Sequence, residues 1–155
     1  MFYWAKSIAP LPFLLTVAAC AQPSQVPSIH AALDRGAAVA AEHGRSVRCT
    51  RERTKLAFSC VEQLDKDHFT AVDVVAEPIA PNEREPGHRP VQARDPILGP
   101  GGGGGRYSMT TADGAYAIHA TEFQRLMRGT RPKLPSAIRL LEVVAASYDG
   151  RLASR

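Results

Sequence analysis

The chain has 155 residues, a formal net charge of +4 at pH 7, and 45% hydrophobic against 22% charged residues. This length accommodates one small domain, with or without a disordered stretch, and excludes both a multidomain enzyme and a polytopic membrane protein. Aromatic residues make up only 6% of the chain, so we expect a core built mainly from Val, Leu, Ile and Ala. A domain this small buries a modest core, which a disulfide would help to stabilise.

The N-terminal segment has the pattern of an export signal. Lys6 is its only charged side chain, and an apolar run from Ile8 to Ala19 follows and ends in small residues. A positive start, an apolar stretch of about 7–15 residues and small residues at the cut characterise secretory signals. The run is shorter than the ~20 residues that span a bilayer, and its prolines disfavour a helix. We therefore predict a cleaved signal peptide over residues 1–19.

The segment Val17-Ala18-Ala19-Cys20 resembles the lipobox of bacterial lipoprotein precursors, in which an aliphatic and two small residues precede a cysteine. In that family the signal is removed just before the cysteine, which is then acylated on its sulfur and its new amine. The resemblance covers this segment alone and implies that Cys20 anchors the mature chain to membrane lipid. By the same resemblance, Ala21 after that cysteine implies sorting to the outer membrane, facing the periplasm. The alternative is cleavage after Ala21, which also fits the signal-peptidase pattern and would leave a soluble periplasmic or secreted protein.

Residues 28–77 have the pattern of a helix followed by strands. Ser28 is a suitable N-cap for a helix that runs to about His43 and stops at Gly44. Alternating and β-branched residues then predict strands over residues 46–52, 55–63 and 69–76. The preceding residues 20–27 are rich in Pro and Gln, which suits a short tether between the lipid and the domain.

The three cysteines divide into one predicted lipid anchor and one predicted disulfide. Lipidation of Cys20 leaves Cys49 and Cys60 as an even pair in an oxidising compartment. A turn centred near Thr54–Lys55 sets these two residues directly opposite each other on paired strands. We therefore predict a cross-strand disulfide between Cys49 and Cys60.

The second half of the chain begins with an abrupt change of composition. Residues 78–106 combine recurrent prolines with five consecutive glycines and are predicted to form a disordered linker. A C-terminal α/β segment over 107–155 follows, with a short strand at 115–118 and a helix at 121–128 behind Thr121. Residues 136–148 fit either a helix or a strand, and Asp149-Gly150, a hairpin signal, slightly favours the strand.

The expected fold is therefore α+β, with a small antiparallel sheet, a few short helices, one cross-strand disulfide and a Pro/Gly-rich linker. The chain shows no motif for catalysis, metal binding or a cofactor. The glycine run lacks the Lys of a phosphate-binding loop, and the histidines do not have metal-ligand spacing. Ser108, Asp113 and His119 are triad residue types, but triads are assembled by tertiary geometry and not by sequence proximity. We predict no catalytic residue, no metal and no cofactor.

Charge is the remaining signal. Two basic clusters are candidate surfaces for anionic headgroups, lipopolysaccharide or an acidic partner, and a solvated basic face is the alternative. They comprise Arg45, Arg48, Arg51, Arg53 and Lys55, and then Arg125, Arg128, Arg131, Lys133 and Arg139. Nucleic acid is not an expected partner, because an exported protein rarely meets it.

These features favour a lipid-anchored, periplasm-facing accessory or binding module of the bacterial envelope. Its partner would be another envelope protein, for instance in a secretion, conjugation or surface-assembly apparatus. The alternative is a small secreted enzyme or enzyme inhibitor tethered at the membrane. Absence of a catalytic motif favours the binding module.

Overall fold

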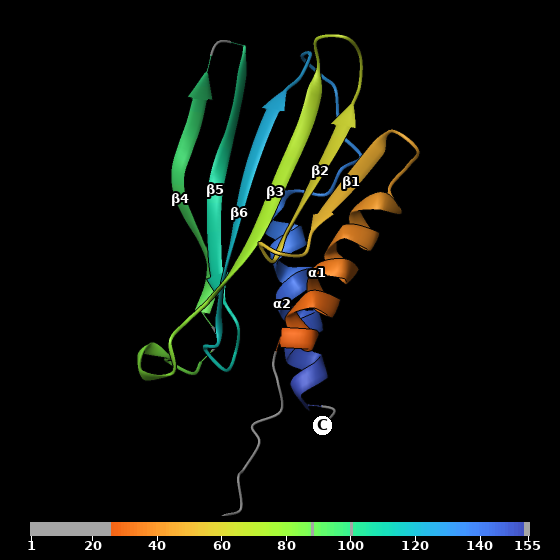
Figure 1. Ribbon diagram of the computed structural model, residues 1–155. Coiled ribbons are helices and arrows are strands. Elements are labelled where there is room, and N and C mark those ends of the chain that lie inside the picture. Colours follow the sequence, from red (N-terminus) through yellow and green to blue (C-terminus); the bar gives the residue numbers. More distant parts are fainter. Residues whose placement is uncertain (1–25, 88, 100, 154–155) are drawn as a thin grey trace, which may run out of the picture.

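The computed structural model describes residues 26–87, 89–99 and 101–153 (Figure 1). In chain order the elements are α1 (Val26–Ala41), β1 (Val47–Glu52), β2 (Ala57–Gln63), β3 (Phe69–Pro78), a short 3-10 helix η1 (Pro81–Glu83), β4 (Arg89–Gly99), β5 (Gly102–Thr110), β6 (Tyr116–Arg125) and α2 (Ala137–Ala153). The predicted signal peptide, Cys20 and most of the tether lie outside the described residues. The helix begins at Val26, so the last two positions of the predicted tether belong to α1.

The strands form one antiparallel sheet of six strands in the order β1-β2-β3-β6-β5-β4. The central pair is β3 with β6, which are far apart in the sequence and pair along their whole lengths. Residues 28–77 and 107–155 therefore share a single sheet. The predicted α+β class with an antiparallel sheet is confirmed.

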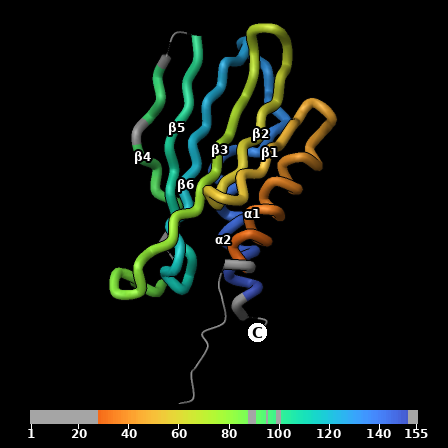
Figure 2. The backbone as a smooth tube through the Cα atoms, viewed as in Figure 1, coloured from red at the N-terminus to blue at the C-terminus, as the bar shows by residue number. Residues whose placement is uncertain are grey.

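Both helices cover the same face of the sheet and pack against each other (Figure 2). Gly36 permits this close approach, since a Cβ at that position would lie 2.6 Å from Cγ2 of Val144 on α2. Between helices and sheet lies the core, whose fully buried side chains include Ile29, Leu33, Phe58, Val72, Val74, Ile118, Leu140, Leu141, Val144 and Tyr148. Neither described helix is long and apolar enough to cross a bilayer. Neither of these two helices lies over the opposite face, here called the open face.

The predicted disulfide is confirmed. Cys49 on β1 and Cys60 on β2 are directly opposite each other, with Cα atoms 4.1 Å apart and their sulfurs bonded. That short separation is typical of a non-hydrogen-bonded antiparallel pair, where side chains approach most closely. The hairpin turn that sets this register contains Leu56 in the left-handed region, at φ +48°.

The prediction of a disordered linker over residues 78–106 is wrong. This range contains η1, all of β4 and half of β5, and the glycine run itself pairs with strands on both sides. Its neighbours explain why: a Cβ on Gly104 would lie 1.8 Å from the backbone oxygen of Glu122, so the strands approach more closely there than side chains allow. The ring of Phe123 lies over Gly102, where a Cβ would be 2.9 Å from the ring's Cζ. Aromatic packing over glycine compensates for the entropy lost in ordering such a strand.

The helix predicted over residues 121–128 is also wrong, because Thr121 lies in the middle of β6. Burial alternates along this strand, with Ile118, Ala120 and Glu122 facing the core. Pairing with β3 on one side and β5 on the other satisfies its backbone, which outweighs local helix propensity.

Of the ambiguous residues 136–148, all but the capping Ser136 belong to α2, so the slight preference for a strand is wrong. The Ser136 hydroxyl accepts the backbone N–H of Arg139 and caps the helix. Asp149 forms no hairpin turn; its carboxylate accepts the backbone N–H of Ala112 from the β5–β6 turn. The Asp149 side chain, which in the sequence indicated a hairpin turn, therefore makes a tertiary contact between α2 and the β5–β6 turn.

Candidate functional site

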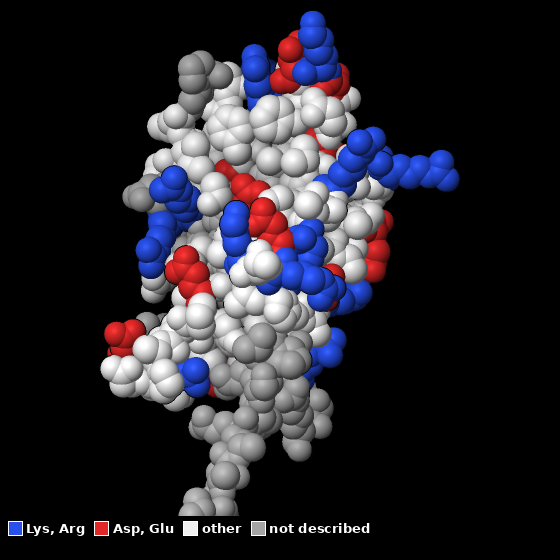
Figure 3. Space-filling model, in the orientation of Figure 1, with Lys and Arg blue, Asp and Glu red and all other residues white. Residues whose placement is uncertain are grey.

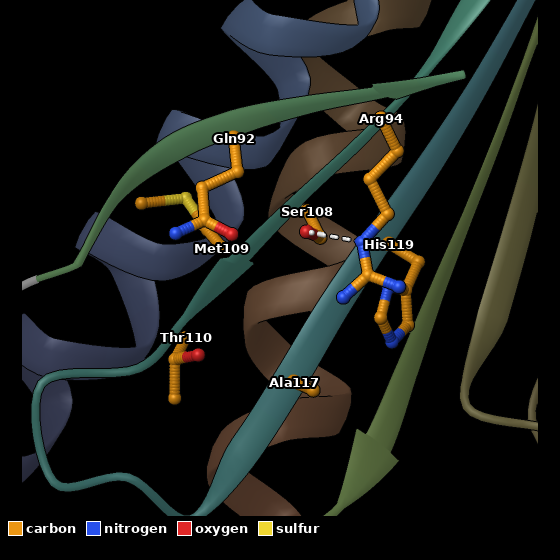
Figure 4. Close-up of a pocket in the computed structure, with 7 residues that line it drawn as sticks. All are labelled: Gln92, Arg94, Ser108, Met109, Thr110, Ala117 and His119. Carbon is orange, nitrogen blue, oxygen red and sulfur yellow. Dashed lines mark hydrogen bonds between the residues drawn. The ribbon is translucent and has the colours of Figure 1, made fainter. Parts of the chain in front are cut away.

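The open face contains a small pocket near the end of the sheet where β5 turns into β6 (Figure 4). Its lining includes Gln92 and Arg94 from β4, Ser108 and Thr110 from β5, and Ala117 and His119 from β6. These positions alternate along β5 and β6 with core residues such as Met109 and Ile118. The pocket has a volume of about 90 Å³.

A row of polar side chains crosses four strands at this pocket. Arg94 reaches from β4 over β5, where its Nε donates a 3.3 Å hydrogen bond to the hydroxyl of Ser108. Ser108 is paired across the strands with His119. The Nε2 atom of His119 is in turn 3.6 Å from a carboxylate oxygen of Glu77 on β3. Across β4, β5, β6 and β3, the row therefore consists of a guanidinium, a hydroxyl, an imidazole and a carboxylate, in that order.

Ser108, Asp113 and His119, the triad residue types of the sequence, do not form a catalytic triad. Ser108 and His119 are neighbours, but Asp113 belongs to a separate network at the β5–β6 turn. Its carboxylate accepts hydrogen bonds from the Thr111 hydroxyl at 2.8 Å and the Tyr148 hydroxyl at 3.1 Å. Asp113 therefore does not orient the His119 imidazole, whose neighbouring acid is Glu77 instead. Pockets that hold a substrate or cofactor usually enclose about 300–1,000 Å³, several times the volume found here.

The first predicted basic cluster is largely engaged in structural contacts. The Arg51 side chain is only 14% exposed and bonds Asp34 on α1 at 2.9 Å, so it ties that helix to β1. Arg53 also pairs with Asp34, and Lys55 pairs with Glu52. Three of the five predicted basic residues therefore stabilise the hairpin and its contact with α1.

The other two residues of that cluster lie close to part of the second. Arg45 and Arg48 line a shallow depression near the start of β1. The buried carboxylate of Glu62 accepts hydrogen bonds there from the Ser46 hydroxyl and from the backbone N–H of Lys133. Lys133 of the second cluster therefore lies beside the end of the first, and its Cδ would be 3.5 Å from a Cβ on Gly44.

The remaining members of the second cluster are dispersed. Arg139 pairs with Glu142 on α2, and Arg125 ends β6. Arg128 and Arg131 are exposed in the segment between β6 and α2. In Figure 3, Lys and Arg are interspersed with Asp and Glu over the face shown, so no single basic area dominates it.

Sequence reasoning missed Gln92 and Arg94 as site residues, because their surroundings resemble a linker. The structure places them on an edge strand with two prolines and two irregularities in register. No periodic pattern in that stretch could have identified them. His119 and Ser108 were named for their chemistry, and their pairing depends on the β5–β6 register.

Comparison with protein-family models, with curated proteins and with solved structures gives no match to this chain. Among the described residues, no group of three His, Cys, Asp or Glu side chains is placed to hold a metal ion.

Proposed function

We propose that this chain is a lipid-anchored, periplasm-facing accessory module of the bacterial outer membrane, which binds an envelope protein through its open face. The observation that carries the proposal is the one-sided packing of the sheet. Both described helices cover one face, and neither lies over the other (Figure 1). A helix-free antiparallel face is a broad, rigid surface on which a partner can dock.

The half of the open face remote from the pocket is apolar enough for such contact. Phe69 on β3 and Phe123 on β6 pack with ring centroids 5.8 Å apart, and both rings are partly exposed. Val61 on β2 is 39% exposed beside them. Aromatic and aliphatic side chains within a polar rim are typical of protein interfaces.

The anchoring part of the proposal rests on the lipobox resemblance of residues 17–20. It is tested by metabolic labelling with a fatty-acid analogue, comparing the wild-type protein with Cys20→Ser. We expect label on the wild type, resistance to carbonate extraction, and loss of both in the variant, because multiple acyl chains make membrane attachment effectively permanent. Absence of label from the wild type would rule out the lipid anchor.

The docking part is tested with a photo-crosslinking amino acid at two matched positions. Val61 on the open face and Ile138 on the outer side of α2 are both 39% exposed. We expect a discrete adduct with one envelope protein from position 61 in intact cells, and none from position 138. Equal adducts from both positions, or none from either, would show that the open face is not the docking surface.

A further inference from the structure

We propose that the pocket on the open face binds a phosphate group through Arg94, Ser108, Thr110 and His119. This inference rests on the proposed function only for the source of the phosphate, which we take to be a membrane-lipid headgroup. The chemistry of the pocket itself is independent of any anchor.

The pocket lining is rich in hydrogen-bond donors and contains no carboxylate. Arg94, Gln92, the two hydroxyl groups and His119 all supply N–H or O–H groups, and they come from three adjacent strands. Figure 4 shows the Arg94 guanidinium beside the His119 ring, with Gln92 and Thr110 on the other side of Ser108. A ligand held there meets donors from several directions, which suits a tetrahedral oxyanion better than a planar carboxylate.

Arg94 is already oriented for this role. Its Nε is held by the Ser108 hydroxyl, which is only 7% exposed and fixed within β5. Within the described part of the chain, its two Nη nitrogens have no other partner. A guanidinium with one edge fixed and the other free binds phosphate in two-point fashion at a small entropy cost.

The size of the pocket restricts the ligand to a headgroup. A volume of about 90 Å³ holds a few water molecules or one phosphate group, but not a nucleotide or a sugar. Glu77 lies outside the lining and contacts His119 at 3.6 Å, so its charge opposes an anion on the β3 side of the site. Neutralising Glu77 should therefore strengthen binding.

The position of the pocket indicates where the phosphate comes from. The start of α1 lies at the same end of the domain as the β5–β6 turn (Figures 1 and 2), and the pocket is at that end of the sheet on the opposite face, since Thr110 and Ala117 line it. If Cys20 is anchored, the six residue steps to Val26 span at most about 20 Å. That end of the sheet is then held close to the bilayer surface, where lipid phosphates are concentrated.

The test uses the full mature protein in a non-ionic, phosphate-free detergent, with inorganic phosphate as the probe and NMR or calorimetry as the readout. We expect saturable phosphate binding that Arg94→Gln weakens about tenfold or more, since a charge-assisted contact is lost. Arg106→Gln is the matched control, because Arg106 is an exposed arginine on the next strand that does not line the pocket. It should change affinity less than about twofold.

A second arm identifies the source by adding phosphatidylglycerol or an uncharged diacylglycerol to the micelles. Binding of phosphatidylglycerol but not of diacylglycerol, weakened by Arg94→Gln, supports a lipid headgroup as the ligand. Binding of inorganic phosphate but of neither lipid supports the site and assigns it to soluble phosphate. No saturable binding of either probe, equal weakening by Arg106→Gln, or equal affinity for acetate would overturn the phosphate site. Because this readout does not depend on acylation of Cys20, its failure is distinguishable from failure of the lipid anchor.

Discussion

The carboxylate of Glu62 on β2 accepts a 2.9 Å hydrogen bond from the backbone N–H of Leu134, 72 positions later in the chain. The same carboxylate accepts the N–H of Lys133, and its residue is only 1% exposed. On the adjacent part of the sheet, buried Glu122 accepts the N–H of Ala137 at the start of α2. Two buried acids therefore fix the segment between β6 and α2 onto the core side of the sheet.

Glu62→Ala should lower the free energy of unfolding by about 3 kcal/mol, because two backbone N–H groups lose their acceptor in a buried site. Urea denaturation measures the change. Glu142→Ala is the control, since Glu142 is an exposed acid on α2 whose ion pair with Arg139 contributes little. Similar stability losses in the two variants would show that Glu62 does not hold this segment.

Two neighbouring glycines of the run, Gly103 and Gly104, test how closely β5 approaches β6. A Cβ on Gly104 would lie 1.8 Å from the Glu122 backbone oxygen, whereas a Cβ on Gly103 would have only the Ile97 oxygen at 3.6 Å. Gly104→Ala should therefore destabilise the fold by at least about 2 kcal/mol. Gly103→Ala should leave stability unchanged or raise it by about 0.5 kcal/mol, because it restricts the unfolded chain. Equal effects in thermal denaturation would contradict the close approach.

Removal of the disulfide should weaken the fold without preventing it. Cys49→Ser or Cys60→Ser should lower the free energy of unfolding by about 2–4 kcal/mol, because the short loop between them is no longer closed in the unfolded state. The double variant should lose no more than either single variant. The bond itself is checked by mass spectrometry of the non-reduced protein, where two free thiols would disprove it.

The buried phenol of Tyr148 predicts a decline of stability at alkaline pH. The pKa of Tyr148 is raised well above its ordinary value, mainly because the phenol is buried and secondly because the negative charge of Asp113 is close to it. As pH rises past about 10, the unfolded chain loses this proton while the folded chain keeps it. The free energy of unfolding therefore falls above that pH and is unaffected by this group below it.

Tyr148→Phe removes this titration, so its unfolding free energy should decline less steeply than that of the wild type between about pH 10 and 12. Urea denaturation at a series of alkaline pH values measures both slopes. The variant should also be less stable at neutral pH, because Asp113 loses the hydroxyl that it accepts at 3.1 Å. Parallel pH profiles for the two proteins would contradict the assignment.

The sequence was sufficient for the parts of the fold that depend on local patterning. The register of the β1–β2 hairpin could be predicted to the residue, because alternating polarity and the turn position together place Cys49 opposite Cys60. The first helix could be predicted from its apolar stripe, but its start could not: it begins at Val26, so Ser28 lies inside the helix and is not its N-cap. In these segments local preference and tertiary structure agree.

The remainder depended on contacts that no local pattern encodes. The glycine half of β5 is ordered by Phe123 and by the backbone of β6, not by side chains of its own. Residues 121–128 have helix-forming side chains but gain more by pairing within the sheet. The pocket could not be predicted because Arg94 and His119 meet only after β4, β5 and β6 have been aligned.

The edge strand β4 also limits how copies of this domain can associate. It contains Pro90 and Pro96, which have no N–H to donate, and its register with β5 shifts twice along its length. An irregular edge with missing donors is a poor template for an added strand. Growth of the sheet beyond β4, whether into a fibre or a continuous dimer, is therefore disfavoured even where the chain is crowded at high local concentration.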